Sequence, residues 1–252
     1  AHAGARVDTK DDKTRTALMY AAQNGRAEVV RVLLSRGANP NARNDYPREY
    51  FRFHGSSPHT YADNQISALM YAAEAGHTEV VSILVAAGAR VNAKAYYEET
   101  ALILAAGKGH TATVRKLLEL GANLHANAEA KKRYAESLSY GSGGTALVYA
   151  LREKHVATAR LLVDEYVRRN EPVDDGDMVF MYALSARDLD IVRTLADRKG
   201  IDSEKPSYLS YAAWMSTAEI LKFLHDRQGA QDFRAGRLEP DVLINAAGSG
   251  DL

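Results

Sequence analysis

The sequence predicts an all-α protein, a solenoid of stacked helix-turn-helix units, and two observations lead to this fold class. First, the motif Thr-Ala-Leu-Met-Tyr-Ala-Ala, which begins at Thr16 and is here called the phrase, recurs along the chain with a few substitutions. Second, a glycine, an apolar run and then Gly-Ala-Asn or Gly-Ala-Arg follow the first three copies. Self-similarity at a fixed period of roughly 20 to 50 residues is typical of repeat proteins. The copies lie at 16–22, 67–73, 100–106, 145–151, 178–184, 207–213 and 241–247.

Each copy of the phrase is expected to form the first helix of a repeat. A hydroxyl residue stands where it can accept a hydrogen bond from an unpaired backbone N–H of the first turn. Apolar residues within the phrase fall at helical spacing and mark a packed face. The glycine that follows the phrase suits a left-handed helix end. The hydroxyl positions are Thr16, Ser67, Thr100, Thr145 and Ser207, with Met178 in the fifth copy, and the glycines are Gly25, Gly76 and Gly109.

A second helix should follow each phrase. In the first repeat its predicted core residues are Val29, Val30, Leu33 and Leu34, and Gly37 ends it. The later repeats are less regular, because Lys154 and Arg187 stand where the first glycine is expected. The second half of the chain is therefore predicted to be a diverged continuation of the same solenoid.

The phrase and its spacing resemble the ankyrin family. Thr100 follows Ser67 by 33 residues, which is the period of ankyrin repeats with their turn, two helices and Thr-Pro-Leu-His-x-Ala phrase. This chain departs from the pattern in the first four copies, where Ala replaces Pro and Met, Ile or Val replaces His. In the residues of this phrase, the chain is more similar to bacterial than to animal members of the family.

The resemblance covers nearly the whole chain and implies a single ankyrin-repeat domain over residues 1–252. Two segments exceed the period and are predicted to be long inter-repeat insertions, at 44–61 and 128–139. The two ends of the sequence resemble incomplete repeats, so we expect a solenoid cut mid-repeat at both ends. The predicted repeats lie near 11–43, 62–94, 95–127, 140–172, 173–201 and 202–235, with a partial repeat at 236–252.

Composition narrows the function classes. Lys and Arg total 32, as do Asp and Glu, and this balance argues against an overall electrostatic footprint for nucleic acid or an anionic membrane. No apolar run approaches the ~18 residues that a membrane-spanning helix needs. Cysteine is absent, which excludes disulfides and thiol-based sites. We expect a soluble protein, in the cytoplasm by default, with the periplasm left open.

No arrangement of residues predicts catalysis. His54 and His59 flank a Gly-Ser-Ser-Pro turn, but no third ligand or orienting acid stands at an interpretable spacing. We therefore expect no enzyme activity, no metal, no cofactor and no small-molecule substrate. His77, His110 and His155 recur at one repeat position and resemble the structural histidine of the family, which makes them capping groups.

The resemblance implies a module that binds another protein through turn tips and exposed positions of the first helices. Trp214, the single Trp of the chain, stands at such a position and is the strongest predicted anchor. The aromatic and Arg-rich first insertion either contacts the partner or packs on a neighbouring repeat, and both can hold. The predicted contact residues are Arg15, Gln23, Asn24, Tyr50, Phe51, Arg52, Phe53, Tyr96, Tyr97, Arg152, Trp214 and Met215.

The biological role has several candidates. The similarity of the phrase to bacterial ankyrin repeats and the two long insertions favour a bacterial inhibitor, such as an immunity protein that covers the active site of a toxin. The alternatives are a scaffold or adaptor, an effector that binds host proteins, and a regulatory repeat region of a larger enzyme-containing chain.

Overall fold

The computed structural model describes residues 6–44, 65–128, 143–198, 201, 203 and 206–228. The chain divides into two compact units, unit 1 (residues 1–146) and unit 2 (residues 147–252), and each is considered by itself. Nearly all of the two predicted insertions and the whole of the partial repeat at 236–252 lie outside the described residues.

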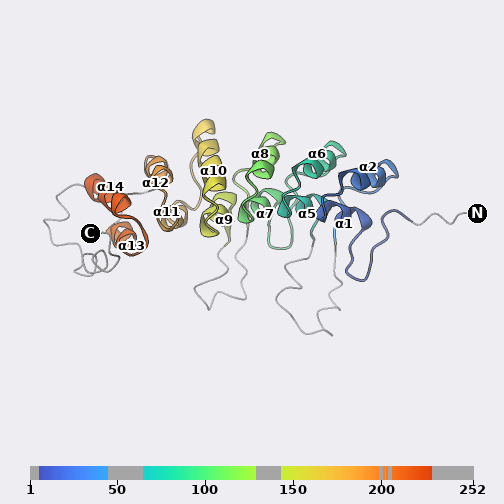
Figure 1. Ribbon diagram of the computed structural model, residues 1–252, viewed down its shortest axis with the longest axis horizontal. Coiled ribbons are helices and arrows are strands. Elements are labelled where there is room, and N and C mark those ends of the chain that lie inside the picture. The colour runs from blue at the N-terminus through green and yellow to red at the C-terminus, as the bar shows by residue number, and fades with distance from the viewer. Residues whose placement is uncertain are drawn as a thin grey trace, which may run out of the picture. The chain divides into compact units, whose positions relative to one another are not determined.

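The described part of unit 1 consists of helix pairs stacked side by side (Figure 1). First helices pack on first helices in one layer, and second helices pack on second helices in another. This is the all-α stack of helix pairs that the sequence predicts. The first helices are α1 (Ala17–Gln23), α5 (Ala68–Glu74) and α7 (Ala101–Gly107), and the second helices are α2 (Ala27–Ser35), α6 (Thr78–Ala86) and α8 (Thr111–Glu119).

The first helices of unit 1 begin and end as predicted. The Thr16 hydroxyl accepts a hydrogen bond from the Met19 backbone N–H at 3.4 Å, and Ser67 and Thr100 cap α5 and α7 in the same way. The glycines that follow these helices, Gly25, Gly76 and Gly109, have φ angles of 66°, 78° and 74°. Only glycine adopts this left-handed conformation at little cost, so these glycines end the helices.

A histidine joins each helix pair of unit 1 to the preceding one. The Nε2 atom of His77 lies 3.0 Å from the carbonyl oxygen of Gln23, at the end of α1. His110 makes the same contact, at 2.9 Å, with the carbonyl oxygen of Glu74 at the end of α5. Because a carbonyl oxygen only accepts, Nε2 carries the proton and donates.

The sequence predicts His77 and His110 as capping groups, and this contact shows which group each ring caps. Neither side chain makes a capping hydrogen bond at the start of its own second helix. Instead, each ring satisfies a carbonyl group that has no intrahelical partner at the end of the preceding first helix. The histidines are therefore links between repeats.

The His77 ring also explains why Gly25 has no side chain. A Cβ atom at Gly25 would lie 2.6 Å from the Cε1 and Nδ1 atoms of His77, and a Cβ at Gly76 would meet His110 at the same distance. Gly37, which ends the second helix, has a φ of 85° but open space around its Cα. Gly25 is thus constrained by backbone conformation and by close packing, whereas Gly37 is constrained by conformation alone.

Asparagine side chains link the loops that follow the second helices. Asn41 donates to the Gly88 carbonyl and accepts from the Arg90 backbone N–H, both at 2.9 Å. One repeat later, Asn92 donates to the Gly121 carbonyl at 3.1 Å and accepts from the Asn123 backbone N–H at 2.8 Å. These bonds satisfy loop backbone groups and hold the loops of successive repeats in register.

One predicted core residue of unit 1 is exposed. Val30 is fully buried in α2, but Val29 is 48% exposed, so its placement in the core is wrong. The equivalent residue in the next repeat, Val80, is 1% exposed because α2 packs against α6 and covers it. Helix α2 packs chiefly on α1 and α6, and its opposite face carries Val29.

The described part of unit 2 continues the pattern of helix pairs (Figure 1). Helix α11 packs on α13, and α12 contacts both α10 and α14. Lys154 and Arg187, which replace the turn glycine, keep its left-handed conformation with φ angles of 61° and 58°. The helices are α9 (Ala146–Arg152), α10 (Val156–Arg169), α11 (Gly176–Ser185), α12 (Leu189–Ala196), α13 (Pro206–Met215) and α14 (Ala218–Gln228).

The helix starts around unit 2 differ from the predicted capping pattern. Helix α13 begins at Pro206, so Ser207 lies in its first turn and does not cap it. Proline suits the first helical position because its φ is already helical and its missing N–H has no partner to lose there. Met178 lies inside α11, which begins at Gly176. The Thr145 hydroxyl, just before α9, is buried without a hydrogen-bond partner in the described structure.

We predict that Gly25→Ala destabilises the protein more than Gly37→Ala. Both substitutions place an alanine at positive φ, at a cost of about 1–2 kcal/mol. Only Gly25→Ala also drives a methyl group into the His77 ring, which adds about 1–3 kcal/mol. Denaturant unfolding followed by circular dichroism measures both. Equal losses for the two variants would contradict the packing role of His77.

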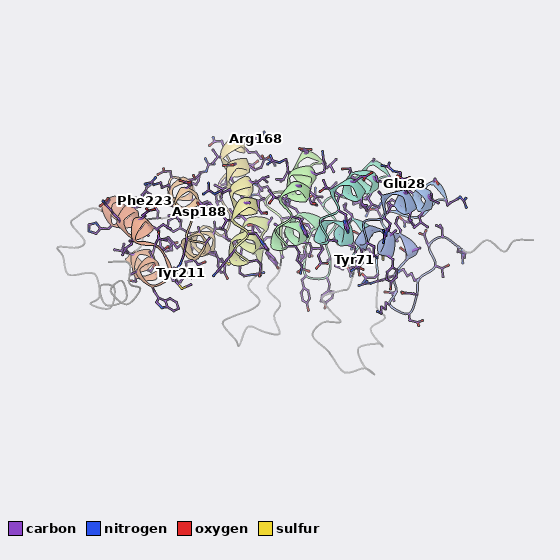
Figure 2. The ribbon with its side chains drawn as sticks, in the orientation of Figure 1. Glu28, Tyr71, Arg168, Asp188, Tyr211 and Phe223 are labelled. Carbon is purple, nitrogen blue, oxygen red and sulfur yellow. The ribbon has the colours of Figure 1, made fainter. Side chains whose placement is uncertain are left out.

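A second prediction concerns the acid stability of α10. Glu165 accepts hydrogen bonds from the Nε atoms of Arg168, labelled in Figure 2, at 2.9 Å and of Arg169 at 2.6 Å. The bonds from Arg168 and then Arg169 lower the pKa of Glu165 to about 2. A lowered folded-state pKa means that this stabilisation is present above pH 4.5 and is lost as the pH falls towards 2.

Glu165→Gln is therefore expected to lower the free energy of unfolding by about 1 kcal/mol at pH 7. The difference between wild type and variant should shrink steadily below pH 4.5 and vanish near pH 2. Urea unfolding of both proteins across this range measures it. A difference that is independent of pH would show that the glutamate acts through packing instead of charge.

Candidate protein-binding surface

In unit 1 the segment that precedes each first helix is here called a finger, and the fingers before α1 (residues 10–16) and α7 (residues 94–100) are described over their whole length (Figure 1). Backbone pairing closes the base of the first finger between Lys10 and Thr16, and that of the second between Arg43 and Ser67. In the third finger, residues 94–100, the Ala95 N–H donates to the Glu99 carbonyl at 2.8 Å. The short strands β1 (Asn127–Ala128) and β2 (Gly144–Thr145) close a fourth base in the same register.

Thr14, Gln65 and Glu98 occupy equivalent positions, each two residues before the capping hydroxyl of a first helix. Their φ angles are 56°, 63° and 63°, all in the left-handed region. A non-glycine residue in this region is uncommon. The backbone therefore has the same left-handed conformation just before α1, α5 and α7, although the side chains differ.

The predicted turn-tip residue Arg15 is held against the first-helix layer. Its guanidinium carbon lies 4.5 Å from the centroid of the Tyr71 ring and 5.6 Å from that of Tyr20. Its Nη1 donates to the side-chain oxygen of Gln23, another predicted contact residue, at 3.1 Å. Arg15 thus joins two repeats by cation–π contacts and is only partly exposed.

Tyr71, labelled in Figure 2, anchors the base of the second finger. Its hydroxyl accepts a hydrogen bond from the Asn44 side-chain amide at 3.2 Å. Asn44 is completely buried, and its side-chain oxygen accepts from the Ile66 N–H at 2.6 Å. The two strands that leave and enter this finger are therefore tied to α5.

The first finger is held by a carboxylate. Asp11 accepts hydrogen bonds from the Tyr20 hydroxyl at 2.7 Å and from the backbone N–H groups of Arg15 and Lys13, at 2.8 and 3.0 Å. The Tyr20 hydroxyl is the largest cause of a pKa of Asp11 below its ordinary value, and the Arg15 N–H adds to it. Asp11 is therefore ionised at neutral pH and fastens the finger to α1.

The third finger presents two aromatic residues that the sequence predicts as contacts. Tyr96 is 49% exposed, and its ring meets that of Tyr97 edge-on with 5.0 Å between centroids. Gln23 and Asn24 lie exposed at the end of α1, where Asn24 donates to the Tyr20 carbonyl at 2.8 Å. Among the described residues of unit 1, Tyr96 is thus the exposed large aromatic side chain, and it lies on the third finger.

In unit 2, Trp214 is 66% exposed on the first helix α13. Its ring meets that of Tyr211, labelled in Figure 2, edge-on with 6.5 Å between centroids. Burial raises the pKa of the Tyr211 hydroxyl. Met215 is partly buried, and its carbonyl accepts from the Nε of Arg187 at 3.0 Å. Among the described aromatic side chains of unit 2, the one most open to solvent is the predicted anchor Trp214.

The remaining predicted contacts divide into two groups. The Arg152 guanidinium lies 4.3 Å from the centroid of the Tyr149 ring, and its Nε donates to Glu153 at 3.1 Å, so it is engaged within unit 2. Tyr50, Phe51, Arg52 and Phe53 lie outside the described residues.

A groove in unit 1 was not predicted from the sequence. It has a volume of roughly 730 Å³ and lies between the base of the second finger and the third finger. One signal for it was present, because Lys10, Arg43 and Lys94 occupy the same repeat position at the base of three fingers. The groove is lined by Arg43, Gln65, Arg90, Asn92, Ala93, Lys94, Ala95, Tyr96 and Glu98.

Within the described residues, no group of three or more His, Asp or Glu side chains is placed to hold a metal ion. In the same part of the chain, no helix combines the length and apolar character needed to cross a membrane.

Stacked helix pairs with fingers beside the first helices define a helical repeat protein. Residues 49–128 and 99–171 match the family model described as ankyrin repeats in three copies, and residues 14–45 match that of the single ankyrin repeat. These segments make up more than half of the chain, which therefore belongs to the ankyrin repeat family. Ankyrin repeats are generally protein–protein interaction modules.

Curated relatives are similar over part of the chain. "Ankyrin repeat, SAM and basic leucine zipper domain-containing protein 1" of Dasypus novemcinctus is 34% identical over 105 residues, covering 34% of this chain and 22% of the relative. Its counterpart in Ornithorhynchus anatinus is 36% identical, covering 33% and 22%. "Glycerophosphocholine phosphodiesterase gde1" of Schizosaccharomyces pombe is 37% identical, covering 36% and 6%. These relatives are animal and fungal, and they give no support to a bacterial source.

We predict that Tyr20→Phe raises the pKa of Asp11 towards the ordinary value of 3.8. The substitution removes the hydroxyl donor, which is the largest cause of the lowered pKa, and keeps the ring. Carboxyl-carbon NMR titration of Asp11 measures the change. An unchanged pKa of Asp11 would contradict the contact.

Proposed function

We propose that this protein is a non-catalytic module that binds another protein through its first helices and fingers. The observation that carries the proposal is the 66% exposure of Trp214 at a first-helix position of α13. Tryptophan is enriched among residues that dominate binding energy, and exposing it to water without a partner is unfavourable. A partner that covers this side chain removes that cost.

Tyr96 supports the same reading in unit 1. It stands at the end of a finger, is half exposed, and is braced edge-on by Tyr97. A braced aromatic ring loses little conformational entropy when it is buried in an interface. Each unit therefore offers an aromatic anchor on the side of its first helices, and each anchor can be tested by itself.

The balanced charge and the binding surface shape the expected partner. With 32 basic and 32 acidic residues, the chain lacks the overall positive field that favours nucleic acid or an anionic membrane. We therefore infer a protein partner, with no cofactor and no small-molecule substrate. Among roles of this kind, a bacterial inhibitor that covers the active site of a toxin, a scaffold, and an effector that binds host proteins are all compatible with the anchors.

A second candidate function is the regulation of an enzyme within a longer chain. The yeast relative supports it, because the similarity covers only 6% of a protein named as a phosphodiesterase. In such a chain the repeats would bind a catalytic domain or its regulator. The open reading frame that encodes this sequence tests the idea directly, and a reading frame without a catalytic domain would contradict it.

We predict that Trp214→Ala and Tyr96→Ala each weaken partner binding, by about 2 kcal/mol or more if the residue is an anchor. The partner is first captured from a lysate of the source organism on the tagged protein and identified by mass spectrometry. Titration calorimetry with the purified partner then measures the affinities.

Matched controls come from the second-helix layer. Val167→Ala in unit 2 and Val32→Ala in unit 1 also remove exposed apolar side chains, which are 42% and 54% exposed. They should leave the affinity unchanged. If both anchor variants bind as tightly as these controls, the proposed binding side is wrong.

A further inference from the structure

We propose that the groove between the second and third fingers of unit 1 binds an acidic peptide segment of the partner protein. This inference rests on the proposed function as a protein-binding module and adds the chemistry of the bound segment.

The groove is positively charged. Three cations line it, Arg43, Arg90 and Lys94, against one carboxylate, that of Glu98. Lys94 and Glu98 form an ion pair with each other. Because the charges of Lys94 and Glu98 cancel, no other residue that lines the groove balances the charges of Arg43 and Arg90. Charged groups that face a shallow opening raise the local concentration of opposite charge and select complementary partners.

Neither arginine that lines the groove forms an ion pair with another described residue. Arg43 is partly exposed and donates from Nη1 to the neutral side chain of Gln65 at 3.3 Å. Arg90 is exposed, and within the described residues its guanidinium makes no ion pair. A guanidinium binds a carboxylate through two parallel hydrogen bonds, which lysine cannot do. Aspartate or glutamate side chains are therefore the groups that these positions fit.

The cations stand on rigid backbone. The Arg90 N–H is held by the side chain of Asn41 from the preceding repeat, and Asn92 in turn holds the loop of the next repeat. The base of the second finger is closed by pairing of Arg43 with Ser67. Because the backbone is already fixed by contacts between repeats, binding costs little ordering of the loops.

The shape and lining of the groove favour a peptide over a small molecule. A volume of roughly 730 Å³ lies within the range of small-molecule pockets, but such pockets are lined mainly by apolar side chains. Here, Arg43, Gln65, Arg90, Lys94 and Glu98 supply charged and polar groups. The aromatic ring of Tyr96 at the same groove offers apolar contact to a residue next to the acidic ones.

The test uses the full 252-residue chain and a fluorescein-labelled oligoglutamate of about eight residues, which can span ~26 Å when extended. Fluorescence anisotropy at low and high salt measures the dissociation constant. The variant Arg43→Gln/Arg90→Gln removes both open charges of the groove. The control Arg36→Gln/Arg115→Gln removes two exposed arginines elsewhere in unit 1, so the net charge changes equally.

We expect the groove variant to bind the oligoglutamate about tenfold more weakly than wild type, and the control variant to bind within about twofold. Glu98→Gln removes the opposing carboxylate and releases Lys94, so it should bind about two- to threefold more tightly. Backbone amide shifts of Arg90, Lys94 and Tyr96 should locate the peptide in the groove.

Three results would overturn the proposal. Equal losses in the groove and control variants would show that the peptide responds to net charge alone. Weaker binding of oligoglutamate by the Glu98→Gln variant would show that the Glu98 carboxylate does not repel the peptide. Tighter binding of a labelled single-stranded oligonucleotide than of oligoglutamate, sensitive to the same two arginines, would assign the groove to nucleic acid.

Failure here is separable from failure of the proposed function. If the captured partner loses affinity for Trp214→Ala but not for Arg43→Gln/Arg90→Gln, the protein-binding role stands and the groove proposal falls. If oligoglutamate binds the groove while neither aromatic variant changes partner affinity, the anchors are wrong and the acidic site stands.

Discussion

The contact of a histidine in one repeat with the end of the preceding first helix organises unit 1. His77 donates to the Gln23 carbonyl, and its ring fills the space that a side chain at Gly25 would need. His110 repeats the contact with Glu74 one repeat later. A first helix therefore completes its hydrogen bonds only when the next repeat is in place, which couples the stability of neighbouring repeats.

This coupling places the functional side chains. Once the helix pairs are in register, Asn41 and Asn92 hold successive loops, and the fingers leave the stack from equivalent positions. The described bases of the fingers thus share their backbone pairing while their side chains differ. The third finger carries Tyr96, and the groove between it and the second finger carries Arg43 and Arg90. A regular scaffold thus presents an irregular surface, which is what recognition of one partner requires.

The predicted contact residues differ in how far the structure leaves them exposed. Trp214 and Tyr96 were predicted from their repeat positions and are exposed. Arg15 was predicted by the same rule, yet it lies between Tyr20 and Tyr71. Arg15 is covered because Tyr71, a residue of the next repeat, packs against it. The position of Arg15 within its own repeat does not reveal this neighbour. Arg90 was not predicted, because no residue near it in the sequence indicates that its side chain is exposed.

By itself, the sequence determined the helix pairs, their period, the capping hydroxyls of α1, α5 and α7 and the glycines that end them, because these features depend on local backbone hydrogen bonds and φ angles. Local rules were insufficient at Val29, which carries a core pattern but is 48% exposed. They were also insufficient for the His77 contact and for the groove. Only the tertiary structure decided these features, because burial and charge balance depend on side chains that other repeats bring within a few ångströms.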